Sequence, residues 1–133
     1  MTDETLRIDD PNAFPFWEAA RRHELAVQRC TQCGHHQFYP RPFCLACDAD
    51  APEWVTCSGE ATVYSVTTVH LPLIPDVKPP YQVALVTLRE GPRLLTGIVG
   101  QPCRIGESVT LVWRERADAP PLPCFTAVGE QSA

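Results

Sequence analysis

The sequence is poor in lysine and lacks long apolar runs. Lys78 is the only lysine among 133 residues, and the formal net charge is -5. Binding to nucleic acid phosphates needs clustered Lys and Arg, so nucleic acid is disfavoured as the main partner. No segment approaches the roughly 18 consecutive apolar residues of a membrane span. The N-terminus also lacks the basic and apolar regions of a signal peptide, and we expect a cytoplasmic protein.

Catalytic motifs are missing as well. The chain contains no Gly-rich phosphate loop, no HExxH and no GxSxG. His35, His36 and His70 occupy places where ordinary surface or hydrogen-bonding histidines are expected. With 44% hydrophobic residues the chain can form a core, either as one domain or as a small module attached to a modest one. We therefore predict no catalytic residues, with a small independent hydrolase or transferase as an alternative.

Cysteine, by contrast, is abundant, with seven in the chain. Four of them form two CxxC pairs, Cys30 with Cys33 and Cys44 with Cys47, separated by ten residues. Each CxxC turn places two sulfurs on one side of a tight loop, and two facing loops supply the tetrahedral thiolate set that Zn²⁺ accepts. The spacing predicts a zinc ribbon. Because four cysteines leave no open coordination position, the metal is predicted to be structural.

Other arrangements of these cysteines stay open, namely two structural disulfides, a redox-active CxxC and buried free thiols. Gly34 follows the second cysteine, where the curled backbone of a metal knuckle often needs a positive φ. Asp48 follows the fourth cysteine and tolerates that conformation less readily than glycine. The three remaining cysteines are expected to be buried as small hydrophobic residues; they are Cys57, Cys103 and Cys124.

The N-terminal quarter predicts a tail and one short helix. Residues 1–12 are acidic and without periodicity. Residues 12–24 predict a helix, with Asn12 able to cap it and Pro15 tolerated in its first turn. The aromatic residues of this helix are expected either to pack against the ribbon or to form part of a subunit interface or ligand wall.

The rest of the chain predicts β structure. Residues 25–29 and 37–40 are candidate arms of a ribbon hairpin. Five further strands are predicted over residues 60–70, 81–88, 93–99, 108–113 and 122–128. The proline-rich segment 71–80 is expected to be an exposed loop, and Gly97 predicts a bulge or a sharp coil of its strand.

Five strands after a metal module favour a five-stranded OB-fold barrel. The predicted fold class is therefore mainly β, with a short N-terminal helix, a rubredoxin-like zinc ribbon and then the barrel. The expected division is 1–24 for the acidic tail and helix, 25–52 for the zinc ribbon and 53–133 for the OB-fold domain.

Taken in order, these motifs resemble the DUF35 family, whose members combine a rubredoxin-like zinc ribbon with an OB-fold and associate with acyl-CoA enzymes. The resemblance covers residues from about 14 to 128. It rests on CxxCG at 30–34, YPRPxCxxC at 39–47, GxATVYS at 59–65, PYxVALV at 80–86, EGPR at 90–93 and LPxF at 122–125.

The resemblance implies a small subunit rather than a stand-alone catalyst. DUF35 members accompany thiolase-fold enzymes, namely thiolases, lipid-transfer-type aldolases and acyltransferases, and help to hold the acyl-CoA in pathways such as steroid or lipid degradation. The catalytic groups then belong to the partner in a hetero-oligomer. The alternatives are a hotdog-fold enoyl-CoA hydratase as the partner and, less favoured, a single-stranded nucleic-acid-binding module.

A CoA thioester as ligand needs Arg or Lys for its phosphates and a flat side chain for its adenine. Candidate contacts lie on the ribbon and beside the proline-rich loop, although each residue also suits packing or surface solvation. They are Phe38, Tyr39, Arg41, Lys78 and Tyr81.

Overall fold

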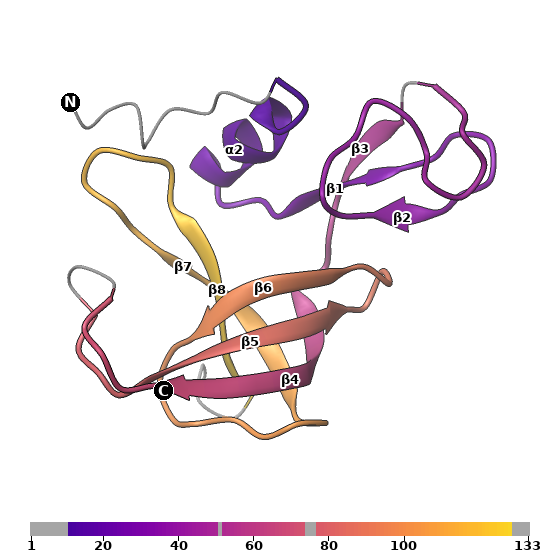
Figure 1. The fold of residues 1–133 in the computed structure, drawn as a ribbon. Helices are drawn as coiled ribbons and strands as arrows, with labels where there is room; N and C mark the ends of the chain where they lie inside the picture. The colour runs from indigo at the N-terminus through magenta and orange to yellow at the C-terminus, as the bar shows by residue number, and fades with distance from the viewer. Residues whose placement is uncertain (1–10, 51, 74–76, 129–133) are drawn as a thin grey trace.

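The computed structural model describes residues 11–50, 52–73 and 77–128, so most of the predicted acidic tail lies outside the described residues. The described chain consists of one short helix, a small sheet that carries the CxxC pairs, and a closed five-stranded barrel (Figure 1). The predicted fold class is confirmed. Among the described helices, none is long and apolar enough to cross a membrane.

Helix α2 (Phe14–Arg21) has Pro15 in its first turn, as predicted. The prediction of Asn12 as its cap is wrong. The N-cap is Ala13, which makes no side-chain cap bond, and its carbonyl accepts the N–H of Phe16 at 3.0 Å. Ala13 is buried, so packing contributes to the position at which the helix starts.

The other end of α2 is closed by a histidine in the left-handed conformation. His23 has φ 60°. The N–H of His23 donates to the Ala20 carbonyl, and the N–H of Glu24 donates to the Ala19 carbonyl, the Schellman pattern that glycine usually completes. The turn directs His23 toward the barrel, where its ring stacks on Trp113 with centroids 5.6 Å apart.

The ribbon sheet contains three strands, β1 (Ala26–Arg29), β2 (His36–Gln37) and β3 (Glu53–Thr56), in the order β2-β1-β3. The predicted hairpin is present as the antiparallel β1–β2 pair. Strand β3, which the expected division assigns to the barrel domain, pairs with β1 along its whole length. The division itself stays a prediction, but the sheet of the ribbon includes residues 53–56.

The barrel closes in the order β4-β5-β6-β8-β7. Each of its strands overlaps one of the five predicted segments, and each pair is antiparallel except β6 with β8. The strands are β4 (Glu60–Val69), β5 (Tyr81–Leu88), β6 (Arg93–Ile98), β7 (Ser108–Arg114) and β8 (Leu122–Ala127).

The predicted bulge at Gly97 is wrong, because Gly97 pairs regularly with Val83. The register of β4 against β5 instead shifts between Val63 and Ser65, which leaves Tyr64 as the extra residue. Tyr64 is exposed, and the Arg93 guanidinium lies 3.7 Å from its ring centroid. The bulge therefore occurs in the longest strand, which must coil to pair with both β5 and β7.

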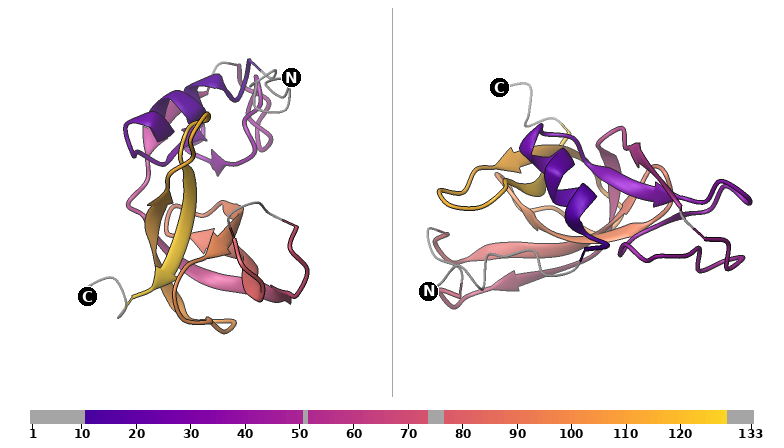
Figure 2. Two further views of the ribbon diagram at one scale, coloured as in Figure 1. Left: turned by 90° about the vertical axis from the view of Figure 1, so that its left-hand side faces the viewer. Right: turned by 90° about the horizontal axis from the view of Figure 1, so that it is seen from above.

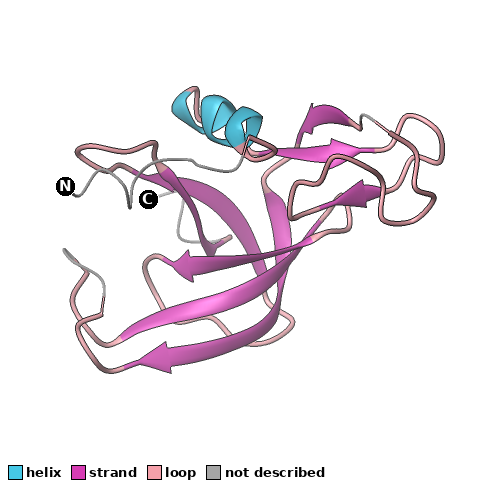
Figure 3. Ribbon diagram, turned by 45° about the horizontal axis from the view of Figure 1, so that its top comes forward, coloured by secondary structure: helices cyan, strands magenta, loops and turns pink. Residues whose placement is uncertain are grey.

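One hydrophobic core joins the ribbon to the barrel. Phe125, at the centre of β8, is fully buried, and the same cluster includes Phe16 of α2 with Leu25 and Val27 of the ribbon. Figures 2 and 3 show the β7–β8 hairpin reaching α2 and the ribbon beside it. As predicted, the three remaining cysteines are buried and free; they are Cys57, Cys103 and Cys124.

Gly59, at the start of β4, is the glycine that the barrel most requires. Its φ is +90°, and an added Cβ would lie 3.2 Å from Leu111 Cβ. We expect Gly59→Ala to lower the free energy of unfolding by about 1–2 kcal/mol, because an L-residue is strained in the left-handed region. The matched control is Gly97→Ala, whose Cβ would make an ordinary 3.8 Å contact with Cys124 Sγ. Urea denaturation measures both, and equal losses would contradict the expectation.

Candidate metal centre and adjoining cavity

The four CxxC sulfurs converge on one point between two loops. All four lie within 4.8 Å of one another. Cys30 Sγ is 3.5 Å from Cys47 Sγ, and Cys33 Sγ is 3.7 Å from Cys44 Sγ. Tetrahedral Zn²⁺ with Zn–S bonds of 2.3 Å requires sulfurs about 3.8 Å apart, whereas a disulfide requires about 2.05 Å. The donor set and its spacing fit a zinc ion.

The two loops have equivalent backbones. Gly34 N–H donates to the Cys30 carbonyl at 3.0 Å, and Asp48 N–H donates to the Cys44 carbonyl at 2.8 Å. Gly34 has φ 79° and Asp48 has φ 65°. Aspartate thus adopts the left-handed conformation that glycine adopts in the first knuckle, a role for which short polar side chains are the best substitutes.

Backbone amides directed at sulfur favour the thiolate form. The amide of Cys33 donates to Cys30 Sγ at 3.4 Å and that of Gln32 at 3.3 Å. The bond from the Cys33 amide has the largest effect. Together the two bonds lower the pKa of Cys30 to about 6 despite its burial. The pKa of Cys47 rises to about 12: the Ala49 amide lowers it, but the hydrogen bond with Cys30 and desolvation outweigh that amide. Because metal ligands must be thiolates, binding of a cation would release the proton from Cys47.

Two buried glutamines hold the segment between the knuckles, and sequence reasoning missed both. Gln28 of β1 and Gln37 of β2 are cross-strand partners, and Gln37 Nε2 donates to Gln28 Oε1 at 2.9 Å. Gln28 also bonds both the N–H and the carbonyl of Arg41, each at 2.7 Å. Gln37 accepts from Leu45 N–H at 2.9 Å and donates to the Phe43 carbonyl at 3.0 Å. A partial signal was present for Gln28, which follows the apolar Ala26 and Val27 in β1, whereas β2 consists only of His36 and Gln37 and gave none.

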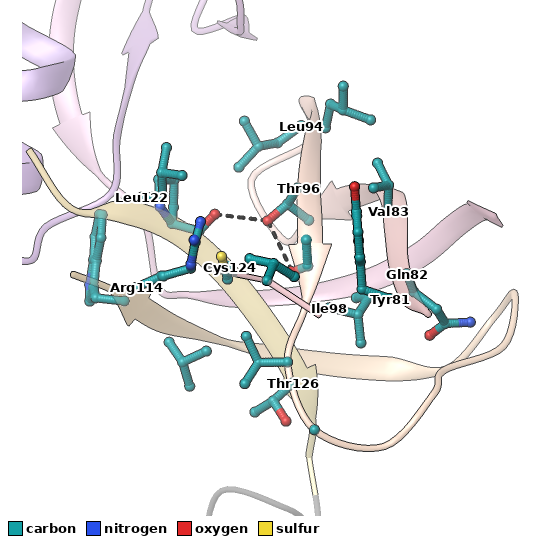
Figure 4. A pocket seen from close by; sticks show the side chains of 18 of the residues that line it. Tyr81, Gln82, Val83, Leu94, Thr96, Ile98, Arg114, Leu122, Cys124 and Thr126 are labelled. Carbon is teal, nitrogen blue, oxygen red and sulfur yellow. Dashed lines mark hydrogen bonds between the residues drawn. The ribbon is translucent and has the colours of Figure 1, made fainter. Parts of the chain in front are cut away.

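A cavity of about 1020 Å³ lies where α2 and the ribbon face the β6–β8 side of the barrel. Figure 4 shows residues from β5, β6, β7 and β8 around it. Its walls are mainly apolar. Burial raises the pKa of Cys124, so that thiol stays neutral in the wall. Aromatic rings form the part of the wall that comes from α2 and the ribbon. The ring centroid of Phe16 lies 4.8 Å from that of Trp17 and 5.4 Å from that of Phe38. The helix aromatics therefore both pack on the ribbon and line the cavity.

Four of the five predicted CoA contacts line this cavity, namely Phe38, Tyr39, Lys78 and Tyr81. Arg41 is not among the lining residues; its side chain is exposed. Arg114 also lines the cavity and was missed, because only the pairing of β7 with β8 places it there. The structure thus brings four of the five predicted contacts to one cavity, and their role in binding CoA stays a prediction.

Comparisons with known proteins agree with this architecture. A model of the ChsH2 rubredoxin-like zinc ribbon domain matches residues 17–53, and a model of the ChsH2 C-terminal OB-fold domain matches residues 54–114. A DUF35 domain-containing scaffold protein of Methanothermobacter thermautotrophicus is 32% identical over 101 residues, which cover 71% of this chain and 75% of the relative. The chain belongs to the DUF35 family.

Two further likenesses link this DUF35 chain to enzyme complexes. A chain of the solved Ltp2-ChsH2(DUF35) aldolase is 35% identical, with a TM-score of 0.83, over 91% of this chain and 98% of that chain. A probable enoyl-CoA hydratase alpha subunit of Thermomonospora curvata is 40% identical over 121 residues, or 89% of this chain. The DUF35 chain spans only 38% of the length of that hydratase subunit.

We expect Gln37→Leu to weaken metal retention without removing a ligand. The change removes the partner of the Leu45 N–H and of the Phe43 carbonyl, and each of these part-buried hydrogen bonds contributes about 1 kcal/mol. Zinc release to a chelator and the melting temperature measure the effect. Cys44→Ser, which removes one sulfur, should lose the metal altogether. The control is Gln32→Leu, because the Gln32 side chain is exposed. Zinc release from Gln37→Leu at the wild-type rate would contradict the expectation.

Proposed function

We propose that this DUF35 chain is a non-catalytic accessory subunit that docks onto a thiolase-fold enzyme and holds an acyl-CoA thioester for it. The observation that carries the proposal is the likeness to the DUF35 chain of the Ltp2-ChsH2 aldolase, which extends over 98% of that chain at 35% identity. The two chains align over nearly their whole length with a TM-score of 0.83, so their backbones present similar surfaces to a partner. The catalytic groups would come from the partner.

The state of the remaining thiols supports a non-catalytic role. Cys57 is buried, and desolvation, followed by the charge of Glu90, raises its pKa to about 12. Burial also raises the pKa of Cys124. A thiol that stays protonated is a poor nucleophile. Neither cysteine therefore supplies the activated thiolate that acyl transfer needs.

The four CxxC cysteines are proposed as the ligands of a structural Zn²⁺. Bound there, the ion would supply a cross-link between the two knuckles rather than a reaction centre, because four thiolates fill its coordination sphere. The cross-link would hold β2 in place, and β2 is followed directly by Phe38 and Tyr39 of the cavity wall. Metal binding would in this way support the cavity.

The cavity is proposed as the acyl-CoA site. Its volume of about 1020 Å³ and its apolar walls suit an acyl chain with part of the CoA. Lys78 and Arg114 would pair with the phosphates, and Phe38, Tyr39 and Tyr81 provide flat faces for the adenine. Arg41 lies outside the cavity lining and is the least supported of the candidate contacts.

A hotdog-fold enoyl-CoA hydratase is the second candidate partner. Its support is the 40% identity to a probable enoyl-CoA hydratase alpha subunit, which exceeds the identity to the aldolase chain. The matching part makes up only 38% of that subunit, so the likeness concerns a module of the hydratase rather than its whole length.

Capture of the complex from the native source tests the partner. We expect a tagged chain to recover a thiolase-fold subunit in a fixed stoichiometry, measured by mass spectrometry of the intact complex. Recombinant co-expression with that subunit should then give one peak of the summed mass in size-exclusion chromatography with light scattering. Recovery of a hotdog-fold subunit would favour the second candidate. Recovery of the chain with neither would contradict both.

Calorimetry with a CoA thioester tests the ligand. We expect Lys78→Ala to weaken binding about tenfold, the effect of losing one charge-assisted hydrogen bond of roughly 1.4 kcal/mol. Arg41→Ala is a matched control, since it removes one positive charge but not from the cavity lining. A loss of affinity in Arg41→Ala alone would place the phosphates elsewhere.

A further inference from the structure

The closure of the barrel between β6 and β8 is incomplete. β6 pairs with β5 along its whole length, but with β8 through the single pair Ile98↔Phe125. In an antiparallel pair, alternate residues direct their N–H and C=O groups toward the partner strand and away from it. A residue of β6 whose N–H and C=O point away from β5 therefore directs these groups into the gap toward β8.

Two hydrogen bonds fix that alternation. Leu88 N–H donates to the Pro92 carbonyl at 2.8 Å across the β5–β6 turn, and Val99 N–H donates to the Phe125 carbonyl at 2.8 Å across the gap. The even-numbered residues of β6 consequently face β5, and the odd-numbered residues face β8. Leu95, in the middle of β6, directs its N–H and C=O toward β8.

Pro123 explains why β8 does not meet Leu95. Continuing the register from Ile98↔Phe125 would bring Pro123 beside Thr96, but proline has no N–H to donate to β6. The Thr96 hydroxyl instead donates to the Pro123 carbonyl at 2.8 Å, shown as a dashed line in Figure 4. Beyond this point the β7–β8 hairpin runs toward α2 and away from β6 (Figure 1). Within the described residues, no group forms a hydrogen bond with the outward N–H or C=O of Leu95.

This open edge faces the cavity. The lining includes residues 94–100 of β6 and the segment after it, and residues 122–124 of β8. The outward peptide group of Leu95 is therefore a donor and acceptor pair in a mainly apolar wall. A ligand in the cavity can form hydrogen bonds with this pair if the ligand carries an amide. A sheet edge binds an extended chain in the same way, through the N–H and C=O groups of its backbone.

We propose that the outward edge of β6 at Leu95 pairs with an amide of the pantetheine arm of the CoA thioester, in the manner of an added strand. The inference rests on the proposed acyl-CoA function and assigns the arm a place within it. The pantetheine arm is a narrow, extended chain with two amides, so one of its amides can match the outward N–H and C=O of Leu95. Two basic residues, Lys78 and Arg114, line the same cavity and could pair with the phosphates at the other end of the ligand.

An extended segment of a partner protein could pair with the same edge, since unpaired strand edges attract further strands. The position of the cavity favours the small ligand. Phe16, Trp17, Phe38 and Tyr39 of α2 and the ribbon form part of its wall, so the edge at Leu95 opens into a lined cavity rather than onto a flat surface. Occupation by a partner strand is an outcome that the test below distinguishes.

Amide hydrogen exchange of the full chain, followed by NMR, tests the pairing directly. In the free chain the Leu95 amide should exchange faster than those of Leu94 and Thr96, which face β5. Saturating acyl-CoA should slow exchange at Leu95 at least about tenfold. Protection of Leu95 by the partner subunit in the absence of CoA, with no further change on adding acyl-CoA, would assign the edge to the partner and overturn the inference.

A pair of variants at Leu95 separates the peptide group from the side chain. Leu95→Pro removes the outward N–H without removing a bond to β5, whereas Leu95→Ala keeps the N–H and removes the exposed side chain. We expect acyl-CoA binding to weaken about tenfold in Leu95→Pro and less than twofold in Leu95→Ala, with melting temperatures confirming that both fold. Binding of adenosine 3′,5′-bisphosphate, which lacks the arm, should be equal in all three proteins.

The failures of the two proposals differ. Equal acyl-CoA affinity in Leu95→Pro and Leu95→Ala, with unchanged exchange at Leu95 in the wild type, overturns the pairing and leaves the acyl-CoA function in place. Absence of acyl-CoA binding to the wild-type chain, both alone and in its complex, overturns the acyl-CoA function and the pairing together.

Discussion

Burial of the ribbon's apolar side chains in the barrel core is the interaction on which the rest of the structure depends. Leu25 and Val27 are almost completely buried and belong to the same cluster as Phe125. The stack of His23, at the end of α2, on Trp113 adds a contact between the helix and the barrel. Since the cavity takes its walls from both, its shape exists only while this shared core holds the ribbon and the barrel together.

The metal centre and the cavity are linked through one short strand. β2 contains Gln37, which bonds the segment leading into the second knuckle, and it is followed at once by Phe38, whose ring packs on Phe16. A metal that clamps the knuckles would therefore also fix an aromatic wall of the cavity. In the proposed function, a structural ion would in this way support the ligand site without taking part in chemistry.

The barrel is least complete where the cavity forms. Small barrels remove exposed edges by closing on themselves, but here Pro123 interrupts the closure and leaves part of β6 open. On the same side of the barrel the β7–β8 hairpin approaches the end of α2, and Arg114 and Trp113 of β7 line the cavity there. The open part of β6 and the contact with the helix therefore lie around one cavity.

The sequence by itself determined the short helix, the ribbon hairpin and the five barrel strands, and it predicted four cysteines as a metal ligand set. CxxC spacing and strand periodicity are local, so the two knuckles and all five barrel segments could be predicted from neighbouring residues. Only the tertiary structure decided where α2 starts and that the bulge falls at Tyr64 rather than Gly97. It also decided that Gln28 and Gln37 bond to each other across the ribbon and that Arg114 lines the cavity. These features depend on which distant strands become neighbours, because a hydrogen bond or a cavity wall belongs to a pair of segments and neither segment specifies it alone.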